Sequence, residues 1–283
     1  MRSPAGAASI ITALLIATLF VTGHYMYQSG RCSKQLMKNS AGVVAGASPR
    51  DPFPGSNFIN SELIPKNSIV DMNIGTNLDP IVAKPGTHRI LIDPLFYVCD
   101  SNAKIAEEVT AFCFAVSNYT GFTTFYEYNK NGASSSLSKV SAGTSHERFS
   151  VKAKRTVLVL EANTLFSSIS NRNTTINRLK LDMQGYELTT LRNIRELLEN
   201  PTFILNVHAE CFCSRKDNGK QIYEIDNSCN AIDALLQESG FETSGGVCEN
   251  GEWSDIVAHK KGLGLKFLPS NDWAGERPHD ALS

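Results

Sequence analysis

The sequence is short of charge and of several motifs that mark large enzyme classes. Charged residues make up 19% of the 283 residues, and the formal net charge is −1. Without a basic excess, the chain has no general attraction for nucleic acid or anionic lipid, so we expect no nucleic-acid partner. The chain also lacks the Gly-x-Gly-x-x-Gly motif of dinucleotide-binding folds and the Gly-Lys-Ser/Thr motif of P-loops. These absences argue against NAD and ATP as ligands.

The seven cysteines do not form the Cys-x-x-Cys pairs of structural zinc sites. Four of them, Cys211, Cys213, Cys229 and Cys248, fall in the last third of the sequence. A cysteine content this high is typical of a protein that folds in an oxidising compartment, where these four can form disulfides. The odd total leaves at least one thiol, such as Cys32, unpaired or bridged to another chain. We therefore predict disulfides and no metal site.

The N-terminal segment contains a long apolar run. No charged residue occurs from Pro4 to Gly23, and roughly 20 apolar residues suffice for a helix that crosses the hydrocarbon core of a membrane. A cleaved signal peptide has the same features, with Val21 to Gly23 as the cleavage region. A buried core helix is a third interpretation. We expect residues 1–28 to form a signal anchor that attaches the protein to the membrane, or a signal peptide if the chain is secreted.

The orientation of this anchor is open. By the positive-inside rule, Arg31, Lys34 and Lys38 directly after the apolar run slightly favour a cytosolic C-terminal domain. The glycosylation sequons at Asn118 and Asn173, together with the cysteine-rich last third, fit a luminal domain instead. We expect a single-pass membrane protein of the ER or Golgi with a luminal catalytic domain.

The remainder of the chain divides into a linker, a folded domain and a tail. Residues 29–66 combine Gly, Ser, Pro and Asn without an apolar period, which is typical of a stem. Residues 67–262 alternate short apolar runs with segments of helical spacing, which predicts an α/β domain with a mostly parallel central sheet flanked by helices. The predicted strands cover 68–73, 88–93, 110–116, 122–128, 155–160, 177–182 and 203–207, the predicted helices 186–198 and 231–239, and a predicted hairpin 241–247 and 253–259. We expect residues 263–283 to form a flexible tail.

Two predicted strands end on residues suited to a nucleoside ligand. Asn73, Gly75 and Asn77 belong to the segment that closes the first strand, and ligands of doubly wound sheets bind outside the carboxyl ends of the strands. A glycine there allows close approach of the backbone, although a lone glycine is more often a simple turn. Asp93, at the end of the second strand, can accept hydrogen bonds from the two hydroxyls of a ribose. The alternative is a turn residue before Pro94.

A third strand end carries a box of polar residues, Lys180-Leu181-Asp182-Met183-Gln184-Gly185-Tyr186-Glu187. Asp182 is expected at the carboxyl end of its strand and Gly185 in the following turn. Glu187 falls in the first turn of the next helix, where its charge suits the helix dipole. Glu187 can therefore contact a ligand or cap the helix.

Together with segments 73–77, 93–94, 115–121, 135–137 and 206–210, this box resembles the FkbM family of methyltransferases. The resemblance spans Ile69 to Lys261. It implies a Rossmann-like class I methyltransferase fold, S-adenosyl-L-methionine as the methyl donor, and transfer to a hydroxyl of a small molecule or glycan. The donor-binding residues it implies are Asn73, Gly75, Asn77, Asp93, Ser117, Asp182, Gly185 and Glu187. The titratable groups expected nearest the acceptor are Asp182, the first candidate for the base, then His208 and Glu210.

The sequence departs from the family pattern in its first motif. Asn73 stands where the family usually has an acid, and Asp79 replaces the last glycine. Asn73 can still form hydrogen bonds but not an ion pair with the donor. In addition, Pro80 and Pro85 interrupt the segment between Asn77 and His88, which predicts a loop in place of a helix.

Two other functions compete with this one. A non-catalytic relative of methyltransferases would explain the altered first motif. A Golgi glycosyltransferase would share the anchor, the stem and the α/β domain, but the chain contains no Asp-x-Asp metal motif of that class.

Overall fold

The computed structural model describes residues 66–106, 108–128, 134–141, 149–213, 222–248 and 253–273. All of them belong to the second of two compact units of the chain, residues 55–283. The predicted anchor and nearly all of the predicted stem lie outside the described residues. Within the described residues, no helix combines the length and the hydrophobicity required to cross a membrane.

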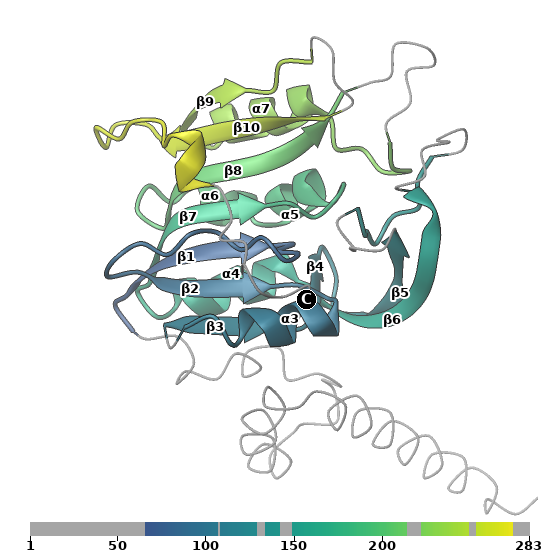
Figure 1. Cartoon of the computed structure of the whole chain (residues 1–283). Coiled ribbons are helices and arrows are strands. Elements are labelled where there is room, and N and C mark those ends of the chain that lie inside the picture. Colours follow the sequence, from purple (N-terminus) through teal and green to yellow (C-terminus); the bar gives the residue numbers. More distant parts are fainter. Residues whose placement is uncertain are drawn as a thin grey trace, which may run out of the picture. The chain divides into compact units, whose positions relative to one another are not determined.

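The prediction of an α/β domain with a mostly parallel central sheet is confirmed. Seven strands form one sheet in the order β3-β2-β1-β7-β8-β10-β9, and β10 alone runs against its neighbours (Figure 1). The strands are β1 (Ile69–Ile74), β2 (His88–Ile92), β3 (Val109–Phe112), β7 (Thr175–Leu181), β8 (Ile204–Phe212), β9 (Phe241–Gly245) and β10 (Trp253–Lys260). Because β2 and β3 extend from β1 to one side and β7 begins the other side, the order of strands reverses between β1 and β7. In open α/β sheets, this reversal point is where ligands bind.

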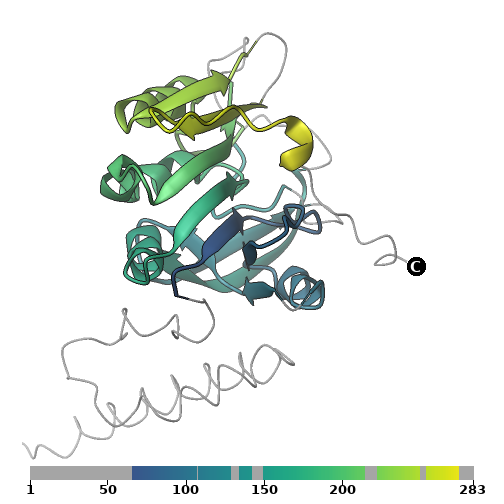
Figure 2. The ribbon, with the colours of Figure 1, turned by 90° about the vertical axis from the view of Figure 1, so that its left-hand side faces the viewer.

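Helices cover the two faces of the sheet unequally. Figure 2 shows α4 (Ala162–Ser170), α5 (Glu187–Asn193) and α7 (Cys229–Glu238) on one face. Their apolar side chains join those of the central strands in the largest hydrophobic cluster. The other face carries α3 (Phe96–Asn102) and the C-terminal described segment. No helix forms among residues 75–87, which confirms the loop predicted between Asn77 and His88.

Two predicted elements were wrong in detail. The apolar run 110–116 is not one strand, because it divides into β3 and β4 (Ala115–Ser117). β4 belongs to a second, three-stranded sheet with β6 (Val151–Glu161) and β5 (Gly121–Tyr128), in the order β4-β6-β5. The predicted helix 186–198 is interrupted at the buried Ile194, whose φ of −106° lies outside the helical region, and continues as α6 (Arg195–Glu199).

The predicted flexible tail is also wrong as far as the structure describes it. Trp273 is buried against Ile81 and Leu91. Its carbonyl accepts a hydrogen bond from Lys180 Nζ at 3.2 Å, and its indole stacks on the ring of His208 with 5.2 Å between centroids. The segment ending at Trp273 therefore covers the face of the sheet that the loop after β1 leaves without a helix. The prediction failed because one tryptophan in a polar segment gives no periodic signal.

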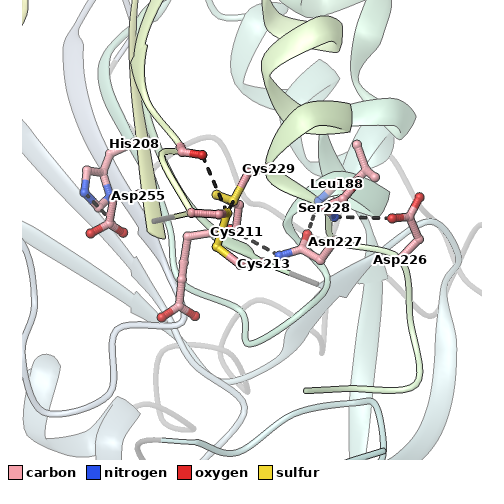
Figure 3. The surroundings of a disulfide bond; sticks show 12 residues. Leu188, His208, Cys211, Cys213, Asp226, Asn227, Ser228, Cys229 and Asp255 are labelled. Atoms are coloured by element: carbon pink, nitrogen blue, oxygen red, sulfur yellow. Dashed lines mark hydrogen bonds and ion pairs between the residues drawn. A yellow bond between two sulfur atoms is a disulfide. The ribbon is translucent and has the colours of Figure 1, made fainter. Parts of the chain in front are cut away.

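Six cysteines form disulfides: Cys99–Cys113, Cys211–Cys229 and Cys213–Cys248. Figure 3 shows Cys211 and Cys229 with Cys213 beside them. The sulfurs of Cys213, Cys229 and Cys248 lie close enough together to suggest a metal site. However, Cys213 and Cys248 are bonded to each other, and Cys229 is bonded to Cys211. The first pair, which ties α3 to the turn after β3, was not predicted. Cys32 lies outside the described residues.

Candidate functional site

A cavity of about 310 Å³ opens where the order of the strands reverses. Its wall combines the segments that follow β1, β2, β3 and β7 with residues 134–137 and the end of β8. Its volume falls at the lower end of the range typical of small-molecule sites. The polar side chains of the wall are Thr76, Asn77, Asp79, Asp93, Ser134, Ser135, Lys180, Asp182, Gln184, Tyr186 and Glu210.

Gly75 lets two walls of the cavity meet. Its φ is +77°, and a Cβ atom at this position would lie 1.8 Å from the carbonyl oxygen of Asp182. Any side chain would therefore push the segment after β1 away from the segment after β7. The Asp182 amide also donates a hydrogen bond to the Ile74 carbonyl at 3.0 Å. Gly75 is required for contact between these two backbones.

Asp93 is a buried carboxyl held in the wall by backbone amides. Its Oδ2 accepts a hydrogen bond from Asn77 N at 2.9 Å, and its Oδ1 accepts one from Leu95 N at 2.8 Å. Burial raises the pKa of Asp93 to about 7, and nearby Asp182 adds to this effect while the two amides oppose it. Each carboxyl oxygen keeps a second lone pair, so Asp93 can accept further hydrogen bonds from the hydroxyls of a ligand.

Asp182 and Glu210 form a second acidic group in the wall, with Gln184 between them. Gln184 Nε2 donates to Asp182 Oδ1 at 2.7 Å and to Glu210 Oε2 at 2.8 Å. Burial raises the pKa of Asp182, whereas Lys180 and the Gln184 amide oppose the rise. An acceptor group in the cavity would thus meet two adjacent carboxyls, one of which has an increased tendency to take up a proton.

Glu187 supports the wall from behind. Its side chain is fully buried, and its two carboxyl oxygens accept hydrogen bonds from the backbone amides of Met183 and Gly185. Burial raises the pKa of Glu187 to about 8. Carboxyl oxygens of Asp182, Glu187 and Glu210 lie within 4.8 Å of one another. Amide donors bind both oxygens of Glu187 and one oxygen each of Asp182 and Glu210.

His208 lies outside the cavity wall. Its ring stacks on Trp273, and its Nε2 is 3.7 Å from Asp255 Oδ1 (Figure 3). Burial, with the nearby charge of Lys180, lowers the pKa of His208 to about 4, so the ring is neutral near pH 7. The prediction of His208 near the acceptor missed that Trp273, far along the chain, covers it.

Of the predicted site residues, the cavity wall brings together Gly75, Asn77, Asp93, Asp182 and Glu210. Five others lie outside the wall: Asn73, Ser117, Gly185, Glu187 and His208. Asn73 Oδ1 instead accepts a hydrogen bond from Ile81 N at 3.0 Å and so fixes the loop after β1. Ser117 Oγ donates to Asn118 Oδ1 at 3.3 Å, at the end of β4.

Sequence reasoning assigned no role to several wall residues. Lys180, Gln184 and Tyr186 belong to the polar box, and Ser135 and Leu137 belong to the short serine segment of the family resemblance. These two motifs were the only features of the sequence that could have identified them as wall residues. Trp253, at the start of β10, had none, because its position depends on the pairing of β10 with β8.

The fold and the cavity define an α/β protein with a small-molecule site at the reversal point of its sheet, which is consistent with a methyltransferase. The model of the methyltransferase FkbM domain matches residues 71–243, more than half of the chain. The chain therefore belongs to the FkbM methyltransferase family. The match runs from β1 to β9 and includes every residue of the cavity wall except Trp253. No curated protein matches the sequence.

Proposed function

We propose that the chain is an S-adenosyl-L-methionine-dependent O-methyltransferase whose acceptor is a hydroxyl of a glycan or small molecule. The observation that carries the proposal is the cavity itself. It combines Asp93, a carboxyl fixed by two backbone amides at the end of β2, with the Asp182–Glu210 pair. Asp93 can accept hydrogen bonds from the hydroxyls of a ribose, and the Asp182–Glu210 pair can take the proton of an acceptor hydroxyl.

The residues of the wall fit the parts of the donor. Asp93 would accept hydrogen bonds from the ribose hydroxyls, and the segment from Gly75 to Asn77 would contact the rest of the nucleoside. Leu95, Phe114 and Phe125 add apolar surface for a purine ring. When bound, S-adenosyl-L-methionine supplies a methyl group on a sulfonium, which an acceptor oxygen attacks in line.

The protein's contribution to this reaction is alignment and removal of a proton. Asp182 is the proposed base, with Glu210 beside it. A buried carboxyl with a raised pKa holds a proton more readily than an exposed one, so it suits a group that must take the hydroxyl proton. His208 has no part in the proposed mechanism, since Trp273 covers its ring.

The altered first motif does not remove this site. Asn73 lies outside the cavity wall, where it holds the loop after β1 through Ile81 N. An acid at this position would serve the same amide. The substitution therefore gives no support to a non-catalytic function.

For the location, we propose a luminal domain attached to the ER or Golgi membrane through residues 1–28. Three disulfides suit an oxidising compartment. Asn118 and Asn173 of the two sequons are both exposed. Expression in eukaryotic cells followed by endoglycosidase treatment tests this: a mobility shift that disappears when both asparagines are replaced by Gln is expected. An unchanged mobility, with thiols open to alkylation, would contradict the luminal location.

The catalytic proposal is tested with the full chain and two ligands. Calorimetry should show binding of S-adenosyl-L-methionine and of its demethylated product, S-adenosyl-L-homocysteine. Incubation with the tritiated donor and a panel of neutral oligosaccharides should then yield labelled methyl ethers, which resist mild alkali, whereas methyl esters do not. Absence of binding of either ligand at millimolar concentration would overturn the proposal.

A further inference from the structure

Gln184 has an unusual backbone conformation. Its φ is +55°, in the left-handed region that residues other than glycine rarely adopt. Such strain persists only where the surroundings hold it, and it is concentrated at functional sites. The neighbouring Gly185 also has a positive φ, so the turn after β7 is bent at two consecutive residues.

Four hydrogen-bonding groups around Gln184 hold it in this conformation. The side-chain amide donates to Asp182 and Glu210, and Oε1 accepts from the Tyr223 hydroxyl at 3.1 Å. The backbone carbonyl accepts from Ser136 Oγ at 2.7 Å. Gln184 therefore connects the ends of β7 and β8 with the serine segment that closes the cavity.

The cavity wall carries an excess of negative charge. It contains the carboxyls of Asp79, Asp93, Asp182 and Glu210 and the single ammonium of Lys180. The methyl donor carries a sulfonium, an ammonium and a carboxylate, so its net charge is positive. The demethylated product lacks the sulfonium and is neutral. An anionic wall consequently attracts the donor more strongly than the product.

We propose that Gln184 is a positioning residue that makes the cavity select the sulfonium donor over its demethylated product. The inference rests on the proposed function and adds to it a residue that distinguishes the two ligands. The amide places a positive dipole end between two carboxyls that lie within 4.8 Å of each other. Without this amide, the like charges of the two carboxylates would repel, which favours uptake of a proton by the pair. The wall would then lose one negative charge.

Of the described groups around the Asp182–Glu210 pair, Gln184 is the one that donates hydrogen bonds to both carboxylates. The charged and titratable groups that face it are Lys180 on β7, His208 on β8, Asp255 on β10, Asp93 after β2 and Glu187 on α5. His208 is neutral near pH 7. Asp93, Glu187 and Asp255 are acids whose pKa values burial raises, so none of them supplies a positive charge to the pair. Lys180 is the one cation among these five, and its Nζ also donates to the Trp273 carbonyl.

Gln184→Met in the full chain tests the inference, because methionine keeps the length of the side chain and lacks the amide. Calorimetry gives the affinities for donor and product at pH 7 and pH 9, each divided by the wild-type value at the same pH to cancel the ionisation of the ligands. At pH 7 the donor affinity should fall by about tenfold, because one charge is lost, and the product affinity by less than about threefold. At pH 9, where the higher pH favours ionisation of the pair, most of the lost donor affinity should be recovered.

Gln237→Met is the matched control, since the Gln237 amide also donates to a carboxylate, that of Asp233, but on the exposed surface. It should change neither affinity. If Gln184→Met lowers the melting temperature too far to be studied, Gln184→Glu replaces it. The glutamate keeps the shape, adds a third carboxyl and should give a steeper dependence of donor affinity on pH.

Equal losses for donor and product, a loss that persists at pH 9, or no change would each overturn the inference, because a merely structural role predicts no difference between the ligands. These outcomes leave the proposed function standing. Failure of the wild-type chain to bind either ligand would overturn the proposed function itself.

Discussion

Acidic side chains near the two ends of the central strands have different hydrogen-bond partners. Near the start of β1, Asp71 Oδ2 accepts a hydrogen bond from Arg178 on β7 at 2.6 Å, and both side chains are fully buried. At the carboxyl ends of the strands, Asp93 and Asp182 accept hydrogen bonds from neutral amides. A carboxylate paired with a guanidinium keeps its charge and its geometry, whereas a buried carboxyl with neutral donors has a raised pKa. The Asp71–Arg178 pair therefore stabilises the fold, whereas Asp93 and Asp182 can bind ligands or exchange protons.

Arg178 also binds the C-terminal described segment. Arg178 donates to the carbonyls of Val82 and Asp272, and Asn177 Nδ2 donates to Asp71 Oδ1 at 3.2 Å. Asp272 further contacts Lys84 at 2.7 Å. One buried pair thus holds β1, β7, the loop after β1 and the segment before Trp273 together.

The largest effect is expected from removal of this arginine. Arg178→Met should lower the free energy of unfolding by about 3–5 kcal/mol, because it leaves Asp71 buried without its cation. Urea unfolding followed by circular dichroism measures the change. In the double variant Asp71→Leu/Arg178→Met, part of the loss should be recovered. A single variant as stable as the wild type would show that the pair is not the structural anchor inferred here.

A smaller and different effect is expected at the cavity. Asp93→Asn should weaken binding of S-adenosyl-L-methionine by about 1–3 kcal/mol, because a charged acceptor for two hydroxyls is lost. Stability should also fall, by about 1–3 kcal/mol, because the asparagine oxygen can accept from only one of the two backbone amides that Asp93 binds. Calorimetry and thermal unfolding of the same sample separate the two quantities. Loss of stability with unaltered affinity would identify Asp93 as a turn residue only.

The raised pKa values of the buried carboxyls should make the stability of the protein depend on pH. The folded-state pKa values of Asp93 and Glu187, about 7 and about 8, lie above the ordinary values of 3.8 and 4.5. The folded protein therefore binds more protons than the unfolded chain in this window, and stability falls as pH rises. Between pH 6.5 and 8 the loss should be about 2–3 kcal/mol in the absence of ligand. The lowered pKa of His208 acts only below about pH 6.5, where it opposes this trend.

Glu187→Gln provides the matched variant for this dependence. Glutamine resembles the protonated acid, so the variant should lose less stability than the wild type over the same interval. Urea unfolding at several pH values gives both slopes. Identical slopes would mean that Glu187 does not titrate as its burial predicts.

The smallest effect is expected at His208. His208→Phe keeps an aromatic ring under Trp273 and should change donor affinity by less than about 0.5 kcal/mol, as a substitution away from the site does. Calorimetry at pH 7 measures it. A tenfold loss would return His208 to the list of groups that act on the ligands.

The sequence predicted those parts of the fold and the site that depend on short-range pattern. The apolar runs of the central strands, the polar box after β7 and the acid after β2 are all local signals. The parts that it did not predict depend on contacts between distant residues. Trp273 covers His208 from 65 positions further along the chain, and Cys99 of α3 pairs with Cys113 in the turn between β3 and β4.

Glu187 and Gln184 show the same limit at close range. Both belong to the box that carried the family resemblance, and spacing alone could not separate a residue that contacts a ligand from one that supports the turn. The structure separates them: Glu187 points its carboxyl at the backbone behind the wall, and Gln184 points its amide at two carboxyls of the wall.

The cavity at the reversal point of the sheet is the proposed binding site of the methyl donor. Ultraviolet cross-linking of methyl-tritiated S-adenosyl-L-methionine to the full chain, followed by peptide mapping, tests it most directly. We expect label in the peptides that contain residues 74–79, 93–95 or 182–186, and less label in the presence of excess S-adenosyl-L-homocysteine or in the Asp93→Asn variant. Label confined to other peptides, or unaffected by the competitor, would contradict the proposed site.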